Sequence, residues 1–131
     1  MGKASQKTIR LLLVDDEEAF VSVLTKRLSK RDVDVTTALN GTEALQRLRH
    51  KDFDVAVLDL KMEGLDGIEV LKIFQRMAPD LPVIMLTGHG CQVAVRESAA
   101  HGAFAYLSKP YDFEQLLLKI REAAGSGGKQ P

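Results

Sequence analysis

Short apolar runs alternate along the chain with segments of helical spacing. The runs that predict β-strands cover residues 9–14, 33–38, 55–58, 83–86 and 104–107. The first, third and fourth runs are almost continuously apolar, which is typical of parallel strands that are covered on both faces. The second run alternates, with Asp34 between Val33 and Val35, and the fifth is short and mixed. We therefore expect the second and fifth strands at the edges of a sheet.

Between these runs, apolar side chains recur at the spacing of an amphipathic helix. The stripes are Phe20, Leu24 and Leu28; Ala44, Leu45 and Leu48; Ile68, Leu71, Phe74 and, less clearly, Met77; and Phe113, Leu116, Leu117 and Ile120. Two of these helices begin with a sequence that resembles a capping box. The boxes are Asn40-x-x-Glu43 and Asp112-x-x-Gln115.

The helix predicted over about 91–101 has the weakest pattern. Its stripe consists of Val95, Ala99 and their neighbours, which are small, and Gly102 fits a C-terminal cap. We expect this helix to be the least tightly packed of the five.

Five strand–helix units with short connections predict a single α/β domain. Right-handed crossovers then build a doubly wound, five-stranded parallel sheet. With the second and fifth strands outside, the order is 2-1-3-4-5, a flavodoxin-like arrangement with five helices. We expect this domain to span 8–124, with flexible tails at 1–7 and 125–131. The order reverses between strands 1 and 3, so a ligand crevice is expected at their carboxyl ends.

Composition narrows the class of protein. Of 131 residues, 45% are hydrophobic and 27% charged, as is usual for a soluble globular domain. Eighteen basic residues balance eighteen acidic ones, which argues against direct binding to nucleic acid or to an anionic membrane. Cys91 is the only cysteine, so no intrachain disulfide can form, and a cytoplasmic location is expected.

Polar residues stand where four of the predicted strands end. Asp15-Asp16 follows the first strand, Asp59 the third, Thr87 the fourth, and Lys109 comes two residues after the fifth. Parallel strands all have their carboxyl ends on the same side of the sheet, so we expect these side chains to lie close together there. Carboxylates in close proximity repel one another unless a cation joins them, and all-oxygen ligands suit Mg²⁺.

The residues taken singly have simpler explanations. The acidic run from Asp15 to Glu18 could equally cap the following helix, Thr87 could serve a turn, and Lys109 could be an ordinary surface lysine. Asp59 is harder to explain in this way. A carboxylate beside a bound cation can attack phosphorus and form an acyl phosphate, while a lysine neutralises charge on the transferring oxygens. The combination of these residues at one edge favours phosphate chemistry.

Over about residues 8–124 the chain resembles the receiver domains of two-component response regulators. The matching stretches are Leu11-Leu12-Leu13-Val14-Asp15-Asp16-Glu17, Val57-Leu58-Asp59-Leu60-Lys61-Met62 with Asp66-Gly67, Val83-Ile84-Met85-Leu86-Thr87-Gly88, and Gly102-Ala103-Phe104 with Tyr106-Leu107-Ser108-Lys109-Pro110. Glu63 departs from the family, which very often has proline at that position.

The resemblance implies a phosphoacceptor and a metal site. Asp59 would accept a phosphoryl group from a histidine kinase or a phosphotransfer protein. Asp16, Asp59 and the backbone carbonyl of Lys61 would ligate Mg²⁺, and Asp15 would act mostly through water. The chain would catalyse only its own phosphoryl transfer and autodephosphorylation, so it would not be an enzyme in the usual sense.

The resemblance also assigns a response to phosphorylation. Thr87 would bond a phosphoryl oxygen, and Lys109 would pair with the phosphate or with Asp59. The bond between Lys109 and Pro110 is expected to be cis. Tyr106 would be the aromatic switch residue that turns inward as Thr87 moves, although a half-buried edge-strand aromatic explains it equally well.

Lys61 and His89 lie two residues after Asp59 and Thr87, at positions that tend to tune the phosphoryl lifetime in this family. Changing either residue should alter the rate of dephosphorylation more than the yield of phosphorylation. Decay rates of the phosphorylated protein that are unchanged in both variants would refute this expectation.

The leading hypothesis is a phosphorylation-controlled switch. The surface that responds would combine the helix over about 91–101, the strand 104–107 and the last helix. Its partner would be an output protein or an effector domain outside this chain, and a homodimer could form through the same surface. The alternatives are an unphosphorylated docking module and, with less support, an Asp-nucleophile phosphatase, whose usual second aspartate is replaced here by Lys61.

Overall fold

A five-stranded parallel sheet in the order β2-β1-β3-β4-β5 forms the centre of the molecule. The structure is a computed structural model that describes residues 8–60, 66–88 and 92–126. Its strands are β1 (Ile9–Val14), β2 (Val33–Ala38), β3 (Val55–Leu58), β4 (Val83–Thr87) and β5 (Ala105–Ser108). Its helices are α1 (Glu18–Ser29), α2 (Gly41–His50), α3 (Gly67–Met77), α4 (Gln92–Ala100) and α5 (Phe113–Ser126). The predicted fold class and strand order are confirmed.

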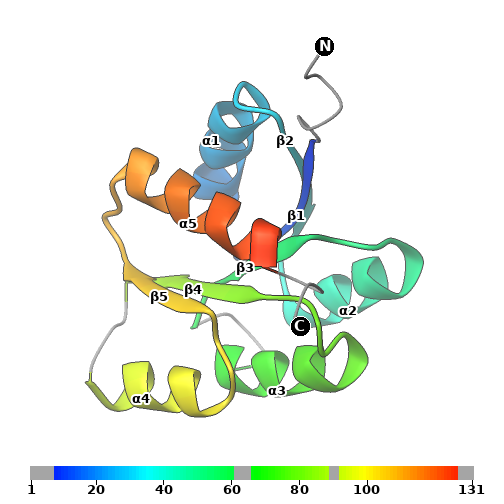
Figure 1. Cartoon of the computed structure of the whole chain (residues 1–131), viewed down its shortest axis with the longest axis vertical. Helices are drawn as coiled ribbons and strands as arrows, with labels where there is room; N and C mark the ends of the chain where they lie inside the picture. Colours follow the sequence, from blue (N-terminus) through cyan, green and yellow to red (C-terminus); the bar gives the residue numbers. More distant parts are fainter. Residues whose placement is uncertain (1–7, 61–65, 89–91, 127–131) are drawn as a thin grey trace.

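Two layers of helices cover the sheet. Figure 1 shows α1 and α5 on one face and α2, α3 and α4 on the other. Each layer closes its own hydrophobic cluster, one containing Leu24, Leu28 and Leu116 and the other containing Leu71 and Phe74. The three central strands contribute alternate side chains to both clusters, which explains why their sequences are continuously apolar.

Several boundaries differ slightly from the predicted ones. Strand β4 continues to Thr87 because this residue still pairs with Ser108 in the ladder to β5. Helix α5 runs to Ser126, two residues beyond the expected end of the domain at residue 124. The segments 1–7 and 127–131, predicted as tails, lie outside the described residues.

Asn40 and Glu43 form the predicted reciprocal cap, whereas Asp112 caps its helix through the amide of Glu114 and not that of Gln115. The Asn40 side chain accepts a hydrogen bond from the Glu43 amide (2.8 Å), and the Glu43 carboxylate accepts one from the amide of Leu39 (2.9 Å). The Asp112 side chain accepts from the amide of Glu114 (3.0 Å). The amide groups that a helix start leaves unpaired are thereby satisfied by side chains.

The prediction for the buried face of α4 is wrong. Val95 is 41% exposed and Ala99 is also exposed, whereas Ser98 is fully buried. Small apolar side chains gave too weak a pattern to orient this helix. The predicted cap is present, since Gly102 has a φ of +86° and the amides of Gly102 and Ala103 donate to the carbonyls of Ala99 and Ser98.

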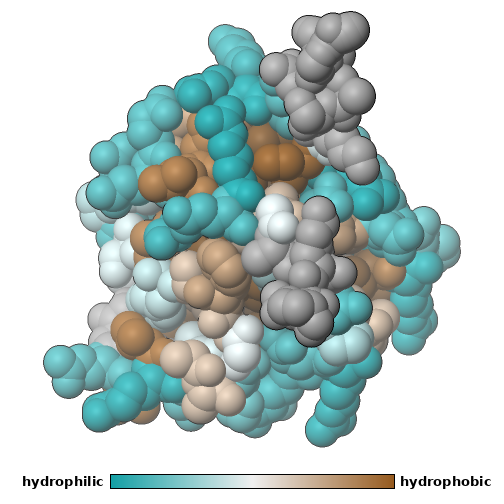
Figure 2. All heavy atoms as spheres, in the orientation of Figure 1, coloured by the Kyte–Doolittle hydropathy of each residue, from teal (hydrophilic) through white to brown (hydrophobic). Residues whose placement is uncertain are grey.

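The face of the molecule shown in Figure 2 is mainly hydrophilic. In the view of Figure 2, apolar side chains show through in separate patches rather than as one continuous face. Met77, the uncertain member of its predicted stripe, is 40% exposed, while Phe74 one turn earlier is fully buried. No helix in the described ranges is long and apolar enough to cross a membrane.

Candidate phosphoryl-acceptor and metal site

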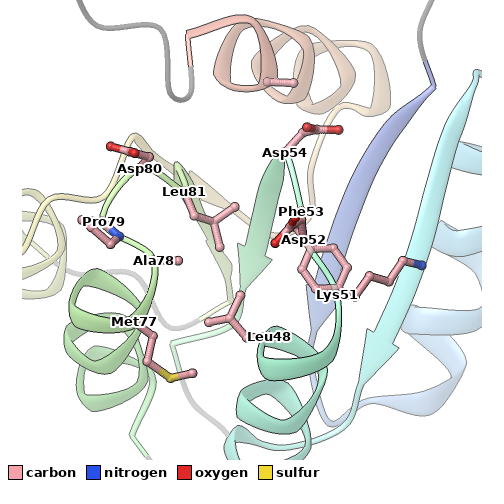
Figure 3. Close-up of a pocket in the computed structure, with 11 residues that line it drawn as sticks. Leu48, Lys51, Asp52, Phe53, Asp54, Met77, Ala78, Pro79, Asp80 and Leu81 are labelled. Carbon is pink, nitrogen blue, oxygen red and sulfur yellow. The ribbon is translucent and has the colours of Figure 1, made fainter.

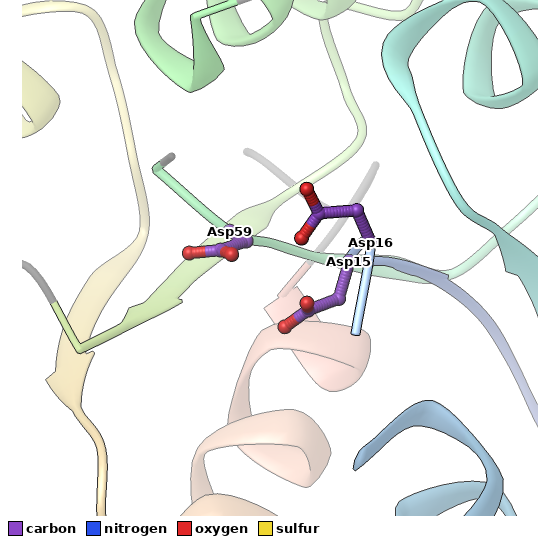
Figure 4. A group of neighbouring side chains, drawn as sticks. All are labelled: Asp15, Asp16 and Asp59. Atoms are coloured by element: carbon purple, nitrogen blue, oxygen red, sulfur yellow. The ribbon is translucent and has the colours of Figure 1, made fainter. Parts of the chain in front are cut away.

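Three carboxylates meet where β1 and β3 end. Ligand oxygens of Asp15, Asp16 and Asp59 all lie within 4.8 Å of one another. Figure 4 shows the three side chains projecting from the ends of the two strands into one small region. The strands pair in parallel up to Val14 and Leu58, so the residues that follow are brought side by side. The amide of Asp59 donates a hydrogen bond to the carbonyl of Val14 (3.0 Å), which holds the ends of β1 and β3 together.

Asp15 is the most deeply placed of the charged residues at this edge. Its exposed fraction is 2%, and its Oδ1 accepts a hydrogen bond from the amide of Glu17 (3.0 Å). Burial raises the pKa of Asp15 because the charged form loses water, and the negative charge of Asp59 adds to this effect. The hydrogen bonds from Lys109 and from the Glu17 amide lower the pKa but do not cancel the rise.

Lys109 supplies the positive charge beside the carboxylates. Its Nζ donates to Asp15 Oδ2 (2.7 Å) and to Glu17 Oε1 (3.0 Å), and it lies 4.1 Å from the centre of the Phe20 ring. Desolvation by burial lowers the pKa of Lys109, but the hydrogen bonds to Asp15 and Glu17 and the negative charges of Asp15 and Asp59 together outweigh it, so the net pKa is raised. The predicted cis bond to Pro110 is present.

The expected partner of Lys109 was a phosphate or Asp59, and the hydrogen bonds described above go to Asp15 and Glu17 instead. Asp59 still acts on the ammonium through its charge, which raises the pKa of Lys109. The ammonium therefore lies near Asp59 but is hydrogen-bonded to Asp15 and Glu17.

Gly67 closes the back of the site. A Cβ at this position would lie 2.4 Å from the carbonyl oxygen of Asp59 and 2.6 Å from the Cα of Leu60. The amide of Gly67 donates to the carbonyl of Leu60 (2.7 Å), and α3 begins at Gly67 with the Asp66 side chain as its cap. The start of α3 is thus packed directly against the backbone that carries Asp59.

Thr87 and Tyr106 lie on the neighbouring strands. Thr87 is fully buried at the end of β4, and its carbonyl accepts a hydrogen bond from the amide of Lys109 (2.9 Å). Tyr106 pairs across the ladder with Met85, is half-buried, and has its hydroxyl oxygen shielded from solvent. The two residues predicted to respond together therefore belong to adjacent strands.

The sequence did not identify every residue of the site. Glu17 was considered only as part of an acidic run that could cap the helix, Phe20 only as part of an apolar stripe, and Gly67 had no predicted role at the site. The three-residue spacing of Glu17 and Phe20 is the one sequence signal that they share a helix face. Lys61 and His89, predicted as a carbonyl ligand and as residues that tune lifetime, lie outside the described residues.

Loss of Lys109 should destabilise the protein. In Lys109→Met the buried Asp15 carboxylate keeps its desolvation but loses its 2.7 Å ammonium partner. We expect the free energy of unfolding, measured by urea titration without metal at pH 7, to fall by about 2 kcal/mol.

The loss should depend on pH. The pKa of Asp15 is raised in the folded protein and rises further in the variant, so the ionised carboxylate costs stability above that pKa. Below the unfolded-state pKa of about 3.9 the group is protonated in both states, and the penalty disappears. The difference from wild type should therefore shrink as the pH falls. Lys119→Met, which removes an exposed pair with Glu122, is the control and should cost under about 0.5 kcal/mol at every pH.

A separate pocket lies at the opposite side of the sheet, where the amino ends of β3 and β4 are. Figure 3 shows this pocket of about 310 Å³, lined by residues 51–54 before β3, by residues 77–81 before β4, and by Leu48 and Ala124. Its residues precede the strands, whereas the carboxylates follow them. The pocket is therefore remote from Asp59 and contributes nothing to the acidic cluster.

The acidic cluster fits a hard divalent cation. Within the described residues, it contains three carboxylates and no histidine or thiol, and all-oxygen ligands of this kind suit Mg²⁺ rather than zinc. Two of the three side chains are buried, so their mutual repulsion is poorly screened by water. A cation bound among the three carboxylates would relieve this repulsion.

Comparison with known proteins identifies the family to which the chain belongs. The family model described as "Response regulator receiver domain" matches residues 11–121. Among curated proteins, the chain is 35% identical over 119 residues to the transcriptional regulatory protein GlrR of Escherichia coli K12 and 36% identical over 111 residues to the DNA-binding transcriptional regulator NtrC of the same strain. The alignments cover 91% and 85% of this chain but only 27% and 24% of those proteins.

Solved structures show the same arrangement. A CheY-like receiver domain protein from Methanospirillum hungatei JF-1 superposes with a TM-score of 0.87 at 29% identity, covering 91% of this chain and 95% of that one. A receiver domain protein from Clostridium thermocellum superposes with a TM-score of 0.85 at 31% identity, covering 89% and 94%. The chain therefore belongs to the response regulator receiver domain family of two-component signalling.

Proposed function

We propose that this chain is a phosphorylation-controlled switch in which Asp59 accepts the phosphoryl group. The observation that supports this most directly is the meeting of Asp15, Asp16 and Asp59 within 4.8 Å, with the Lys109 ammonium hydrogen-bonded at its side. A structural cap for α1 would need one of these carboxylates, not all three, and it would not need the buried Asp59 from another strand.

The proposed transfer is a nucleophilic substitution at phosphorus by the Asp59 carboxylate. A carboxylate oxygen of Asp59 attacks the phosphorus of a phosphohistidine on a kinase or phosphotransfer protein, the P–N bond breaks, and the imidazole leaves with the electron pair. Asp16, Asp59 and the Lys61 carbonyl would hold Mg²⁺, and Asp15 would act through water. The ion would neutralise charge on the transferring oxygens. Thr87 would donate its hydroxyl to a phosphoryl oxygen, and Lys109 would add the second positive charge.

The output surface is proposed to be α4, β5 and α5. Val93 and Val95 on α4, Phe104 just before β5 and Leu118 on α5 are apolar and at least 40% exposed, which suits a surface that contacts another protein. Tyr106 on β5 would couple this surface to Thr87. The partner would be an output protein, an effector domain or a second copy of the chain. GlrR and NtrC are transcriptional regulators by name, so control of transcription through an effector outside this chain is the output we favour.

Intact mass spectrometry tests the proposal. The protein is incubated with a small acyl-phosphate donor with and without Mg²⁺, and its mass is followed with time. A single phosphoryl adduct that needs Mg²⁺ and then decays supports the switch. Sustained turnover of varied phosphomonoesters would support a phosphatase instead, and the absence of an adduct under all conditions would support a docking module.

Mg²⁺ should also stabilise the folded protein without any phosphodonor. A ligand that binds only the folded state adds roughly 2.7 kcal/mol to the free energy of unfolding at about 100 times its dissociation constant. We expect Mg²⁺ to raise the urea midpoint of wild type and to have little effect on Asp16→Asn. An equal shift in both proteins would show that the ion binds elsewhere.

A further inference from the structure

The first turn of α1 carries an interaction that the proposed function does not use. Glu17 is the N-cap residue of α1, yet its side chain makes no hydrogen bond to the helix amides. Its carboxylate instead accepts a hydrogen bond from the ammonium of Lys109 (3.0 Å), a residue 92 positions away in the sequence. An acidic N-cap residue normally stabilises its own helix, so this side chain serves a tertiary contact in place of the local one.

An aromatic ring completes the surroundings of the ammonium. Phe20 lies one turn after Glu17 on the same face of α1, and Lys109 Nζ is 4.1 Å from the centre of its ring. The ring of Tyr111 packs edge-on against Phe20 with the centroids 5.9 Å apart. A cation over an aromatic face is attracted by the ring, so Glu17 and Phe20 both stabilise the ammonium in this position.

Asp15, the other partner of Lys109, has a competing role. Its carboxylate belongs to the cluster that suits a divalent cation, and an ion bound there would draw on the same negative charge. Glu17 is 64% exposed and lies outside that cluster. Glu17 and Phe20 contact Lys109 from outside the cluster, so a cation bound there leaves both contacts in place.

We propose that Glu17 and Phe20 form a resting seat for the Lys109 ammonium, which the ammonium leaves when Asp59 carries a phosphoryl group. This inference rests on the proposed function. The Lys109 amide is tied to the Thr87 carbonyl (2.9 Å), so the backbone stays in place and the flexible side chain alone must swing. Glu17 is then a positioning residue that competes with the phosphoryl group for one cation and lowers the phosphorylated fraction.

The first measurement is the phosphorylated fraction at steady state, with a small acyl-phosphate donor and saturating Mg²⁺. In Glu17→Gln the resting form loses its ion pair and the phosphorylated form does not, so the ratio of phosphorylated to unphosphorylated protein should rise roughly two- to fivefold. Glu18→Gln is the matched control, because it removes an equal exposed charge from the adjacent residue. A ratio for Glu17→Gln that equals or falls below that of Glu18→Gln would contradict the proposal that Glu17 holds the Lys109 ammonium in the resting state.

The second measurement follows the ammonium itself. In protein labelled with ¹³C-lysine, the Lys109 side-chain signal is identified as the one missing from Lys109→Arg. In the unphosphorylated protein, Glu17→Gln and Phe20→Leu should both shift this signal, and Glu18→Gln should not. With beryllofluoride, which imitates a phosphoryl group on a carboxylate, the signal should move and lose its dependence on Glu17. Persistence of that dependence would show that the ammonium stays on Glu17 and would refute the proposal.

The experiments distinguish a failure of the proposed function from a failure of the proposed role of Glu17 and Phe20. A wild-type protein that forms no adduct on Asp59 contradicts the proposed function. A wild-type protein that forms the adduct, but whose Lys109 signal is insensitive to Glu17 in the resting state, contradicts only the seat.

Discussion

Asp59→Asn should abolish the phosphoryl adduct completely. The amide nitrogen and oxygen of asparagine are too weakly nucleophilic to form a stable bond to phosphorus, so the loss should exceed the effect of any other substitution at the site. The side chains have nearly the same shape, and the buried environment of Asp59 (5% exposed) should tolerate the neutral amide. The measurement is intact mass after incubation with a small acyl-phosphate donor and Mg²⁺.

Asp66→Asn provides the matched control. Asp66 is exposed, lies seven residues further along, and caps α3 by accepting the Ile68 amide (3.2 Å). Asparagine caps helices equally well, so this variant should fold and accept the phosphoryl group like wild type. An adduct on Asp59→Asn of the same extent as on Asp66→Asn would place the acceptor elsewhere and contradict the assignment.

Gly67→Ala should damage both the fold and the site. The added Cβ would meet the Asp59 carbonyl at 2.4 Å and the Leu60 backbone at 2.6 Å, and neither group can move away as a flexible side chain could. Overpacking typically costs 1–3 kcal/mol, and contact with rigid backbone places this case at roughly 3 kcal/mol or more. We expect that loss in the free energy of unfolding from urea titration. We also expect weaker stabilisation by Mg²⁺, because the strain falls on the segment that carries Asp59.

Gly88→Ala separates the steric effect from the loss of a glycine. Gly88 lies beside the same edge of the sheet, but a Cβ there would be 3.9 Å from its nearest neighbour, the Cβ of Lys109, which is ordinary contact. Its stability should change by under about 1 kcal/mol. Equal losses in the two variants would mean that the close approach at Gly67 does not decide the stability.

The buried faces of the helices were predictable to different degrees. The stripe of α5 proved correct because Leu116, Leu117 and Ile120 are large and distinctly spaced. The face of α4 was predicted wrongly because valine and alanine side chains occur on both sides of that helix. Where apolar residues are small and dispersed, the packing of the neighbouring strands and of α3 decides the orientation, and sequence spacing does not record it.

The interactions of Lys109 illustrate a second limit. Its position after the fifth strand was evident from the sequence, but its hydrogen bonds join residues that are 92 and 94 positions apart. Such partners depend on how α1 is set against the loop before α5, through the edge-on contact of Phe20 and Tyr111. A sequence pattern contains no measure of that distance.

The sequence by itself determined the sheet and the edge at which the chemistry is proposed. Continuous apolar runs specify central parallel strands, and parallel strands necessarily bring the residues after them, Asp15, Asp16, Asp59 and Thr87, to one edge. Only the tertiary structure decided that Lys109 rests on Asp15, Glu17 and Phe20, and that Gly67 backs directly onto Asp59. The physical reason is that strand periodicity is a local property of the chain, whereas an ion pair or a backbone contact within 3 Å depends on the relative placement of whole elements.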